Sequence, residues 1–139
     1  MIERISIRVV GVPDKKTTQQ LIKWFCMAFG LENESSADQG IEEELLGKFI
    51  AAAYSDKGIS SSEIKLKNKI ARSTVIYHLN RMMEAGLIVK RGRQYYLRAT
   101  DMYRSIEEIE YDLEREMMRM LDTAKEFDRL MAVKLKRLK

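Results

Sequence analysis

From Ser105 to the C-terminal Lys139 the chain contains neither glycine nor proline. Apolar side chains recur there in steps of three and four residues, about 3.6 on average, which predicts one long helix with a continuous apolar stripe. Such a stripe needs a cover, so we expect a coiled coil with a second copy, or packing back on an N-terminal helix. The residues expected at a homodimer interface are Ile106, Ile109, Leu113, Met117, Met120, Ala124, Phe127 and Met131.

Charge is segregated along the chain. Residues 57–98 hold ten basic and only two acidic side chains, a net charge of +8, whereas the net charge of all 139 residues is +4. A basic central block suits a polyanionic partner such as double-stranded DNA. Residues 105–120 hold six acidic and two basic side chains, and residues 121–139 carry a net charge of +3. Because its two halves carry opposite net charges, the last helix favours antiparallel pairing with a second copy, although a parallel pair is not excluded.

Residues 1–40 are predicted to form an N-terminal extension. Apolar and polar side chains alternate over Ile2–Val10, which predicts a strand with one solvated face. Thr17–Gly30 has the spacing of a helix that is apolar on more than one side, so it should pack against two surfaces. Glu32–Gly40 is polar and predicts a linker. The sequence identifies no small-molecule effector for this extension.

Residues 41–100 predict a separate domain of three helices and a hairpin. Apolar spacing predicts a helix over Ile41–Tyr54. The serines at 60–62, with Glu63 behind them, predict the start of a short second helix that ends near Lys67. A third helix is expected from about Arg72 to Ala85, ended by glycine at position 86.

A short β-hairpin should follow the third helix. Leu87–Lys90 and Tyr95–Leu97 are apolar and aromatic segments, and Arg91-Gly92-Arg93 between them predicts the turn. The fold class is therefore mostly α with a small β-hairpin (α+β). In this order the elements predict a winged helix-turn-helix at 41–100, flanked by the strand-helix extension at 1–40 and a dimerisation helix at 101–139.

The central block resembles the DNA-binding core of ArsR-type bacterial and archaeal repressors. The matching motifs are Ser73-Thr74-Val75, His78-Leu79, Glu84-Ala85-Gly86-Leu87 and Tyr95-Tyr96. The resemblance covers about 60 of the 139 residues, and the long last helix is similar to that of the archaeal branch, which dimerises through helix pairing. It implies a transcriptional regulator. It does not imply metal sensing, because the cysteine pairs or histidine and aspartate sets of metal-sensing members are missing.

The third helix has a face suited to reading DNA. At about 100° per residue, Val75, Leu79 and Met82 form a core stripe, and Ser73, Tyr77 and Asn80 point the opposite way. Hydroxyl, amide and guanidinium groups on such a helix can contact base edges and phosphates, and an apolar side chain can contact a thymine methyl group. The turn before the helix and the wing should reach the phosphate backbone or minor groove. The residues expected to contact DNA are Lys65, Lys67, Lys69, Arg72, Ser73, Thr74, Ile76, Tyr77, Asn80, Arg81, Arg91, Arg93 and Gln94.

Composition argues against several other functions. The single Cys26 and single His78 exclude an internal disulfide and multi-histidine metal sites, and both residues are expected to be structural. No phosphate-binding glycine loop, nucleophile triad or plausible carboxylate pair is present, so we expect no enzyme, no metal and no cofactor. No segment is apolar over the roughly 20 residues that a membrane helix needs, and we expect a cytoplasmic protein.

The sequence therefore predicts a sequence-specific DNA-binding transcriptional regulator that acts as a homodimer. Two-fold symmetry would give it a pseudo-palindromic site with half-sites about one helical turn apart, or a multiple of that distance. The alternative is a winged-helix protein-interaction module that tethers a transcription or chromatin assembly. Target genes, and whether binding represses or activates them, are left open.

Overall fold

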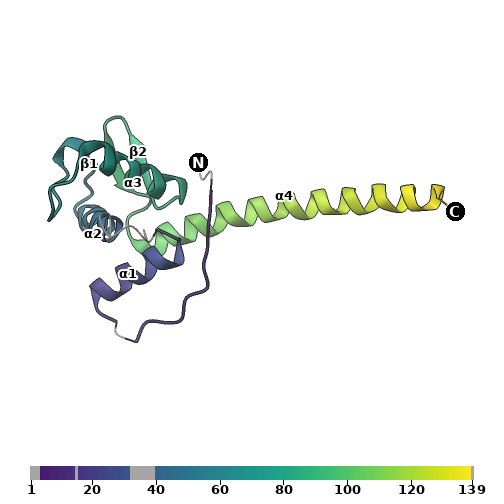
Figure 1. Ribbon diagram of the computed structural model, residues 1–139, viewed down its shortest axis with the longest axis horizontal. Helices are drawn as coiled ribbons and strands as arrows, with labels where there is room; N and C mark the ends of the chain where they lie inside the picture. The colour runs from purple at the N-terminus through teal and green to yellow at the C-terminus, as the bar shows by residue number, and fades with distance from the viewer. Residues whose placement is uncertain (1–3, 15, 32–39, 139) are drawn as a thin grey trace. The chain divides into compact units, whose positions relative to one another are not determined.

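The computed structural model describes residues 4–14, 16–31 and 40–138. It is mostly helical, with a small antiparallel sheet of strand order β1-β3-β2 (Figure 1). The chain divides into two compact units, Met1–Ile109 (the first unit) and Glu110–Lys139 (the second unit). In order along the chain the elements are α1 Thr18–Ala28, α2 Ile41–Tyr54, β1 Ile59–Ser60, η1 Ser61–Glu63, α3 Arg72–Glu84, β2 Ile88–Arg91, β3 Gln94–Leu97 and α4 Met102–Arg137.

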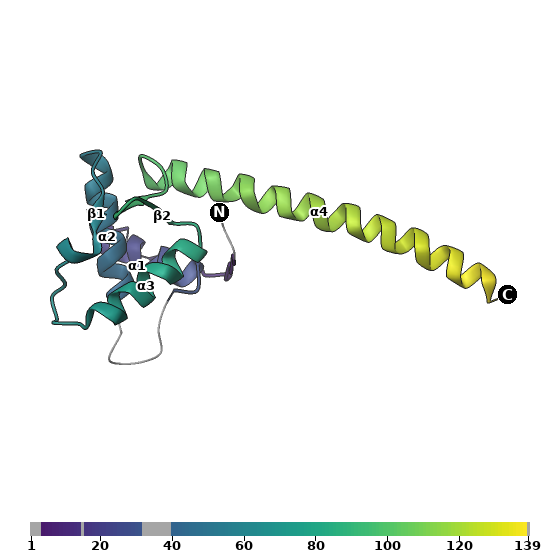
Figure 2. The same ribbon diagram turned by 90° about the horizontal axis from the view of Figure 1, so that it is seen from above.

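The two helices predicted before residue 55 are present. Thr17 caps α1, where its hydroxyl accepts a hydrogen bond from the Gln20 amide at 3.2 Å. The α2 helix begins after Gly40, which adopts a left-handed backbone with φ of 83°. Three glutamates, at positions 42 to 44, occupy the first turn of α2 and complement the positive end of its dipole. Figure 2 shows α1, α2 and α3 grouped together within the first unit.

The predicted hairpin is present and gains a third strand. β2 and β3 pair antiparallel with Ile88 opposite Leu97, and Gly92 takes a φ of 63° in the turn. β1 pairs with β3 on its other side through Ile59 and Tyr95. β1 could not be predicted, because two residues are too few to show the alternation of a strand.

One predicted element of the N-terminal extension is corrected. Residues 4–10, the described part of the segment Ile2–Val10, form no strand. Alternation is not enough for a strand without a neighbouring ladder, and the Arg8 amide here donates to the carbonyl of Ala28 at the end of α1, at 2.8 Å. The predicted linker Glu32–Gly40 lies outside the described residues except for its last glycine.

The second predicted helix is shortened to the single 3₁₀ turn η1. Ser60 and Glu63 form a reciprocal capping box there, but the backbone is extended again at Ile64, with ψ of 119°. The Lys67 amide, which a continued helix would bond to a carbonyl in the preceding turn, donates instead to Oε2 of Glu44 in α2 at 2.8 Å. Residues 64–71 run as an irregular segment between η1 and α3.

The core of the first unit is built mainly from α2, α3 and the sheet. Cys26, as expected, is one of its buried members, together with the predicted α3 stripe. Its residues are Cys26, Phe29, Leu31, Ile41, Leu45, Leu46, Phe49, Val75, Leu79, Met82, Ala85, Leu87, Ile88, Tyr95, Leu97 and Ile109.

A pair of aromatic substitutions in α2 tests this core. Phe49 is 1% exposed and Tyr54, five positions later, is 79% exposed. Phe49→Ala should lower the free energy of unfolding by roughly 3–5 kcal/mol, because it removes apolar contacts and leaves a cavity. Tyr54→Ala should change it by at most about 0.5 kcal/mol. Chemical denaturation measures both, and equal losses would contradict the assignment of Phe49 to the core.

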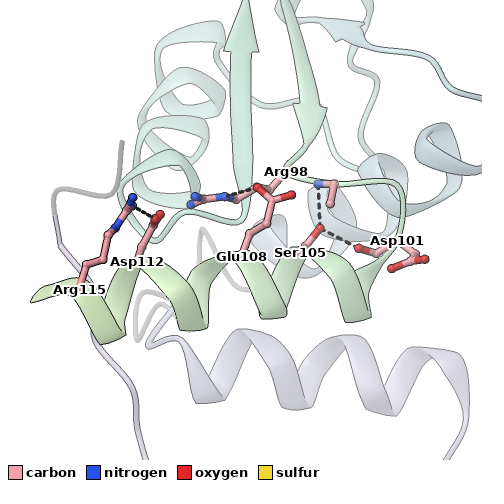
Figure 3. A network of polar contacts seen from close by, with 7 residues as sticks. Arg98, Asp101, Ser105, Glu108, Asp112 and Arg115 are labelled. Carbon is pink, nitrogen blue, oxygen red and sulfur yellow. Dashed lines mark hydrogen bonds and ion pairs between the residues drawn. The ribbon is translucent and has the colours of Figure 1, made fainter. Parts of the chain in front are cut away.

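Polar contacts fix the start of α4. Oδ1 of Asp101 accepts a hydrogen bond from the Arg104 amide at 2.7 Å, as an N-terminal cap does. The Ser105 hydroxyl donates to the Asp101 carbonyl and accepts from the Ala99 amide, and Arg98 Nε lies 3.3 Å from Oε1 of Glu108 (Figure 3). These contacts join the end of the sheet to the first turns of the helix.

The interface predicted along α4 must be corrected at its first two residues. Ile109 is 2% exposed and belongs to the core of the first unit, and Ile106 packs against that core. They are therefore covered by their own chain. Farther along, Met120 is 64% and Phe127 60% exposed.

Within the described residues, no helix is long and apolar enough to cross a membrane.

The second unit also carries ion pairs between residues three positions apart along α4. Asp112 pairs with Arg115, Glu116 with Arg119 and Glu126 with Arg129. The hydrogen bond from Arg129 lowers the pKa of the Glu126 carboxyl below its usual value and raises that of the guanidinium. Exposed ion pairs of this kind add little to the stability of the helix.

Candidate nucleic-acid interface

The outer face of α3 carries uncharged hydrogen-bonding groups. Ser73, Tyr77 and Asn80 are all exposed, and the Tyr77 side chain is 54% exposed. The opposite side of the same helix is buried in the core through Val75, Leu79 and Met82. Thr74 and Ile76, which were also expected to contact DNA, are half-buried at the edges of the outer face. Burial of one side of α3 therefore fixes which groups the other side presents.

The irregular segment before α3 presents three lysines to solvent. Lys65, Lys67 and Lys69 are exposed, whereas Ile64, Leu66 and Ile70 pack against the core. The hydrogen bond from the Lys67 amide to the Glu44 side chain anchors this segment at its middle. Arg72 follows at the start of α3, where its guanidinium donates to the Ser61 hydroxyl of η1 at 3.3 Å. An irregular segment, rather than the predicted helix, thus presents a row of cations before the N-terminal end of α3.

The tip of the β2–β3 hairpin presents two arginines. Arg91 and Arg93 flank Gly92 and are exposed. The Arg91 guanidinium lies over the Tyr96 ring, 5.4 Å from its centroid, and the Tyr96 hydroxyl donates to Oε1 of Gln94 at 2.8 Å. Stacking on a tyrosine restricts the arginine while leaving its N–H donors able to reach an anion. Gln94 is half-buried, and its amide oxygen serves this internal contact.

The tyrosine under Arg91 is held by a close backbone approach. A β-carbon on Gly58 would lie 2.5 Å from the nearest atom of the Tyr96 ring. Only glycine fits at this position without moving the ring. Gly58 thus leaves room for the aromatic side chain that supports Arg91.

Arg81 is directed away from solvent, unlike the other cations predicted to contact DNA. It is 24% exposed, with Nη1 2.9 Å from Oε1 of Glu42 and Nη2 donating to the Gly30 carbonyl at 3.0 Å. Its guanidinium also lies 5.9 Å from the centroid of the Tyr77 ring. Arg81 therefore links α3 to α2 and to the end of α1, and it flanks a residue of the outer face.

A buried carboxylate completes this arrangement. Oε1 of Glu42 lies 2.7 Å from Nδ1 of His78, and both side chains are almost fully buried. His78 is thus a structural histidine, as expected, but Glu42 was not predicted. A signal was available: Glu42 sits on the stripe of α2 formed by Leu45, Leu46 and Phe49, where a charge needs a buried partner.

Removal of this carboxylate should destabilise the first unit strongly. Glu42→Ala leaves the buried His78 and the partly buried Arg81 without the shared carboxylate, a type of change that costs roughly 3–5 kcal/mol. Glu43→Ala, at the more exposed neighbouring position, is the matched control and should cost less than about 1 kcal/mol. Urea titration followed by circular dichroism measures the difference. Similar midpoints for the two variants would contradict a structural role for Glu42.

Comparison with known proteins adds no assignment. No family model, curated protein or solved structure matches the chain. What this surface does must therefore be inferred from its own side chains.

Proposed function

We propose that this chain is a winged helix-turn-helix protein that binds double-stranded DNA sequence-specifically as a homodimer and regulates transcription. The observation that carries the proposal is the outer face of α3, where Ser73, Tyr77 and Asn80 are exposed together. These groups can donate to and accept from base edges when a helix enters the major groove. The cytoplasmic location and the pseudo-palindromic site expected from the sequence belong to the same proposal.

Two sets of cations support this assignment because they lie before and after α3 in the chain. Lys65, Lys67 and Lys69 precede it, and Arg91 and Arg93 form the tip of the hairpin that follows it. In a winged helix the corresponding elements contact phosphates, which fix orientation while the helix reads bases. The second helix of the motif is here the single turn η1, so we assign positioning on DNA to the lysines rather than to a helix in that place. The proposed relationship to ArsR-type regulators, inferred from the sequence motifs alone, would imply the same roles.

A protein-interaction module is the second candidate, and the exposed apolar side chains of the second unit favour it. They would suit a protein partner whether or not the chain binds DNA. The two candidates differ in how their binding responds to salt. For a DNA-binding protein, log affinity falls linearly with log salt, by about 0.9 for each phosphate contact.

A salt titration with DNA tests the proposal. Fluorescence anisotropy of the full chain with a labelled random-sequence duplex should give a slope of about −6 to −10 if most of the exposed cations of both copies in the dimer contact phosphates. Lys23→Ala, an exposed charge on α1, is the control and should leave the slope unchanged. No measurable binding at low salt, or a slope near zero, would contradict DNA binding and favour the protein-interaction module.

A further inference from the structure

The second unit carries a broad apolar stripe on one side of α4. At about 100° per residue, its apolar positions fall within an arc of about 120°. Met120, Leu121 and Phe127 on this arc are each more than half exposed. A continuous apolar surface of this length marks an interaction site. The α4 stripe, as we name it, consists of Leu113, Met117, Met120, Leu121, Ala124, Phe127, Met131, Leu135 and Leu138.

Charge along the same helix distinguishes the possible partners. Residues 110–116 carry four acidic side chains and one basic side chain, a net charge of −3. Residues 129–137 carry four basic side chains and no acidic one, a net charge of +4. A second copy running in the opposite direction places each acidic segment beside a basic one. A parallel copy places like charges together at both ends, which is unfavourable.

The sizes of the side chains select a register for the antiparallel pair. When Leu113 of one copy lies opposite Leu138 of the other, the two stripes overlap over their whole length. Ala124 then lies opposite Phe127, so a small side chain faces a large one on both sides of the centre. Met120 lies opposite Met131 in the same register.

The charged residues beside the stripe agree with this register. Glu116 and Lys134 lie along one edge of the stripe, and Glu114 and Lys136 lie along the other. In an antiparallel pair each edge faces the same edge of the second copy. Each of these glutamates therefore meets a lysine of the other chain near either end of the pair.

We propose that the second units of two copies form an antiparallel coiled coil centred between Lys125 and Glu126. This inference rests on the proposed homodimer and specifies its direction and register. The two Ile109 residues, each 16.5 positions from the centre, are then about 50 Å apart along the axis, at 1.5 Å per residue. A parallel pair would bring them together. The antiparallel arrangement thus keeps the two first units at opposite ends of the coil.

Cysteine cross-linking of the full chain tests direction and register. In the proposed pair, position 120 faces position 131 of the other copy, and the two positions 120 lie 11 residues apart, or about 16 Å. A disulfide requires Cα atoms within about 7 Å. Under mild oxidation, a mixture of Met120→Cys and Met131→Cys chains should therefore form at least tenfold more cross-linked dimer than Met120→Cys alone. The unmodified chain, whose Cys26 is buried, is the baseline.

Each outcome either supports or overturns the proposal. Efficient cross-linking of Met120→Cys with itself would contradict the proposed pair, because it requires either a parallel pair or an antiparallel pair centred on position 120. Equal cross-linking in all combinations, or none together with a monomer in sedimentation equilibrium at 100 µM, would exclude the antiparallel coil. Circular dichroism verifies that both variants remain folded. Because cross-linking needs no DNA, the expected pattern in a chain that fails to bind DNA would support the coiled coil and reject only the DNA-binding function.

Discussion

Replacement of both Arg91 and Arg93 with alanine removes four wing arginines from the proposed homodimer and is expected to reduce the slope of log affinity against log salt by about 3.6 units. Both side chains are exposed at the hairpin tip, and Arg91 is held over the Tyr96 ring. A phosphate contact contributes to the slope because it releases condensed counterions, so the loss of two contacts from each copy of the dimer should be nearly additive. Affinity for specific and for random duplexes should fall together.

The matched control removes two arginines from the second unit. Arg115 and Arg119 are exposed on α4, on the side opposite the α4 stripe, and Arg115→Ala with Arg119→Ala changes the net charge by the same amount. This variant should keep the wild-type slope. A wing variant with an unchanged slope, or a control variant with an equal reduction, would show that the effect of these charges is not local to the wing.

Charges introduced into the α4 stripe should abolish the homodimer. Met120 and Phe127 are largely exposed in the single chain and face the second copy in the proposed coil. Met120→Glu with Phe127→Glu buries four carboxylates in a paired coil, which costs several kcal/mol. We expect the dissociation constant of the dimer to rise at least a hundredfold, and sedimentation equilibrium measures it.

Two apolar residues off the stripe provide the control for this prediction. Leu130 and Val133 are 54% and 42% exposed and lie on the other side of α4. Leu130→Glu with Val133→Glu adds the same charge, and this variant should remain dimeric. If both variants dissociate, total charge rather than the stripe governs assembly. A stripe variant that stays dimeric would contradict pairing through this surface.

The long elements could be predicted because their signals are local. Helical spacing predicted α2 and α3, and the absence of glycine and proline predicted α4. Predictions failed where a distant side chain decided the local structure. The backbone is extended again at Ile64, and the Lys67 amide donates to Glu44, 23 residues earlier, rather than to a helical carbonyl. The N-terminal segment had the alternation of a strand, but residues 4–10 contact helix ends rather than a strand.

In the candidate interface, too, local spacing predicted which residues are exposed, and contacts with other elements could not be predicted. The angular position of a residue on a helix gave the exposure of Ser73, Tyr77 and Asn80. It could not show that Arg81, on the flank of that face, turns toward Glu42 and the carbonyl of Gly30, because both lie in other elements. Nor could spacing along α4 show that Ile109 is used by the core of its own unit.

Selection of bound duplexes from random DNA tests the central claim most directly. The wild-type chain should enrich a single motif, and Asn80→Ala should weaken the preference at one or two base pairs by about 1–3 kcal/mol each. Lys23→Ala should enrich the wild-type motif. Enrichment of a motif that Asn80→Ala, Tyr77→Phe and Ser73→Ala all leave unchanged, or enrichment of no motif, would contradict the assignment of the outer face of α3 to base recognition.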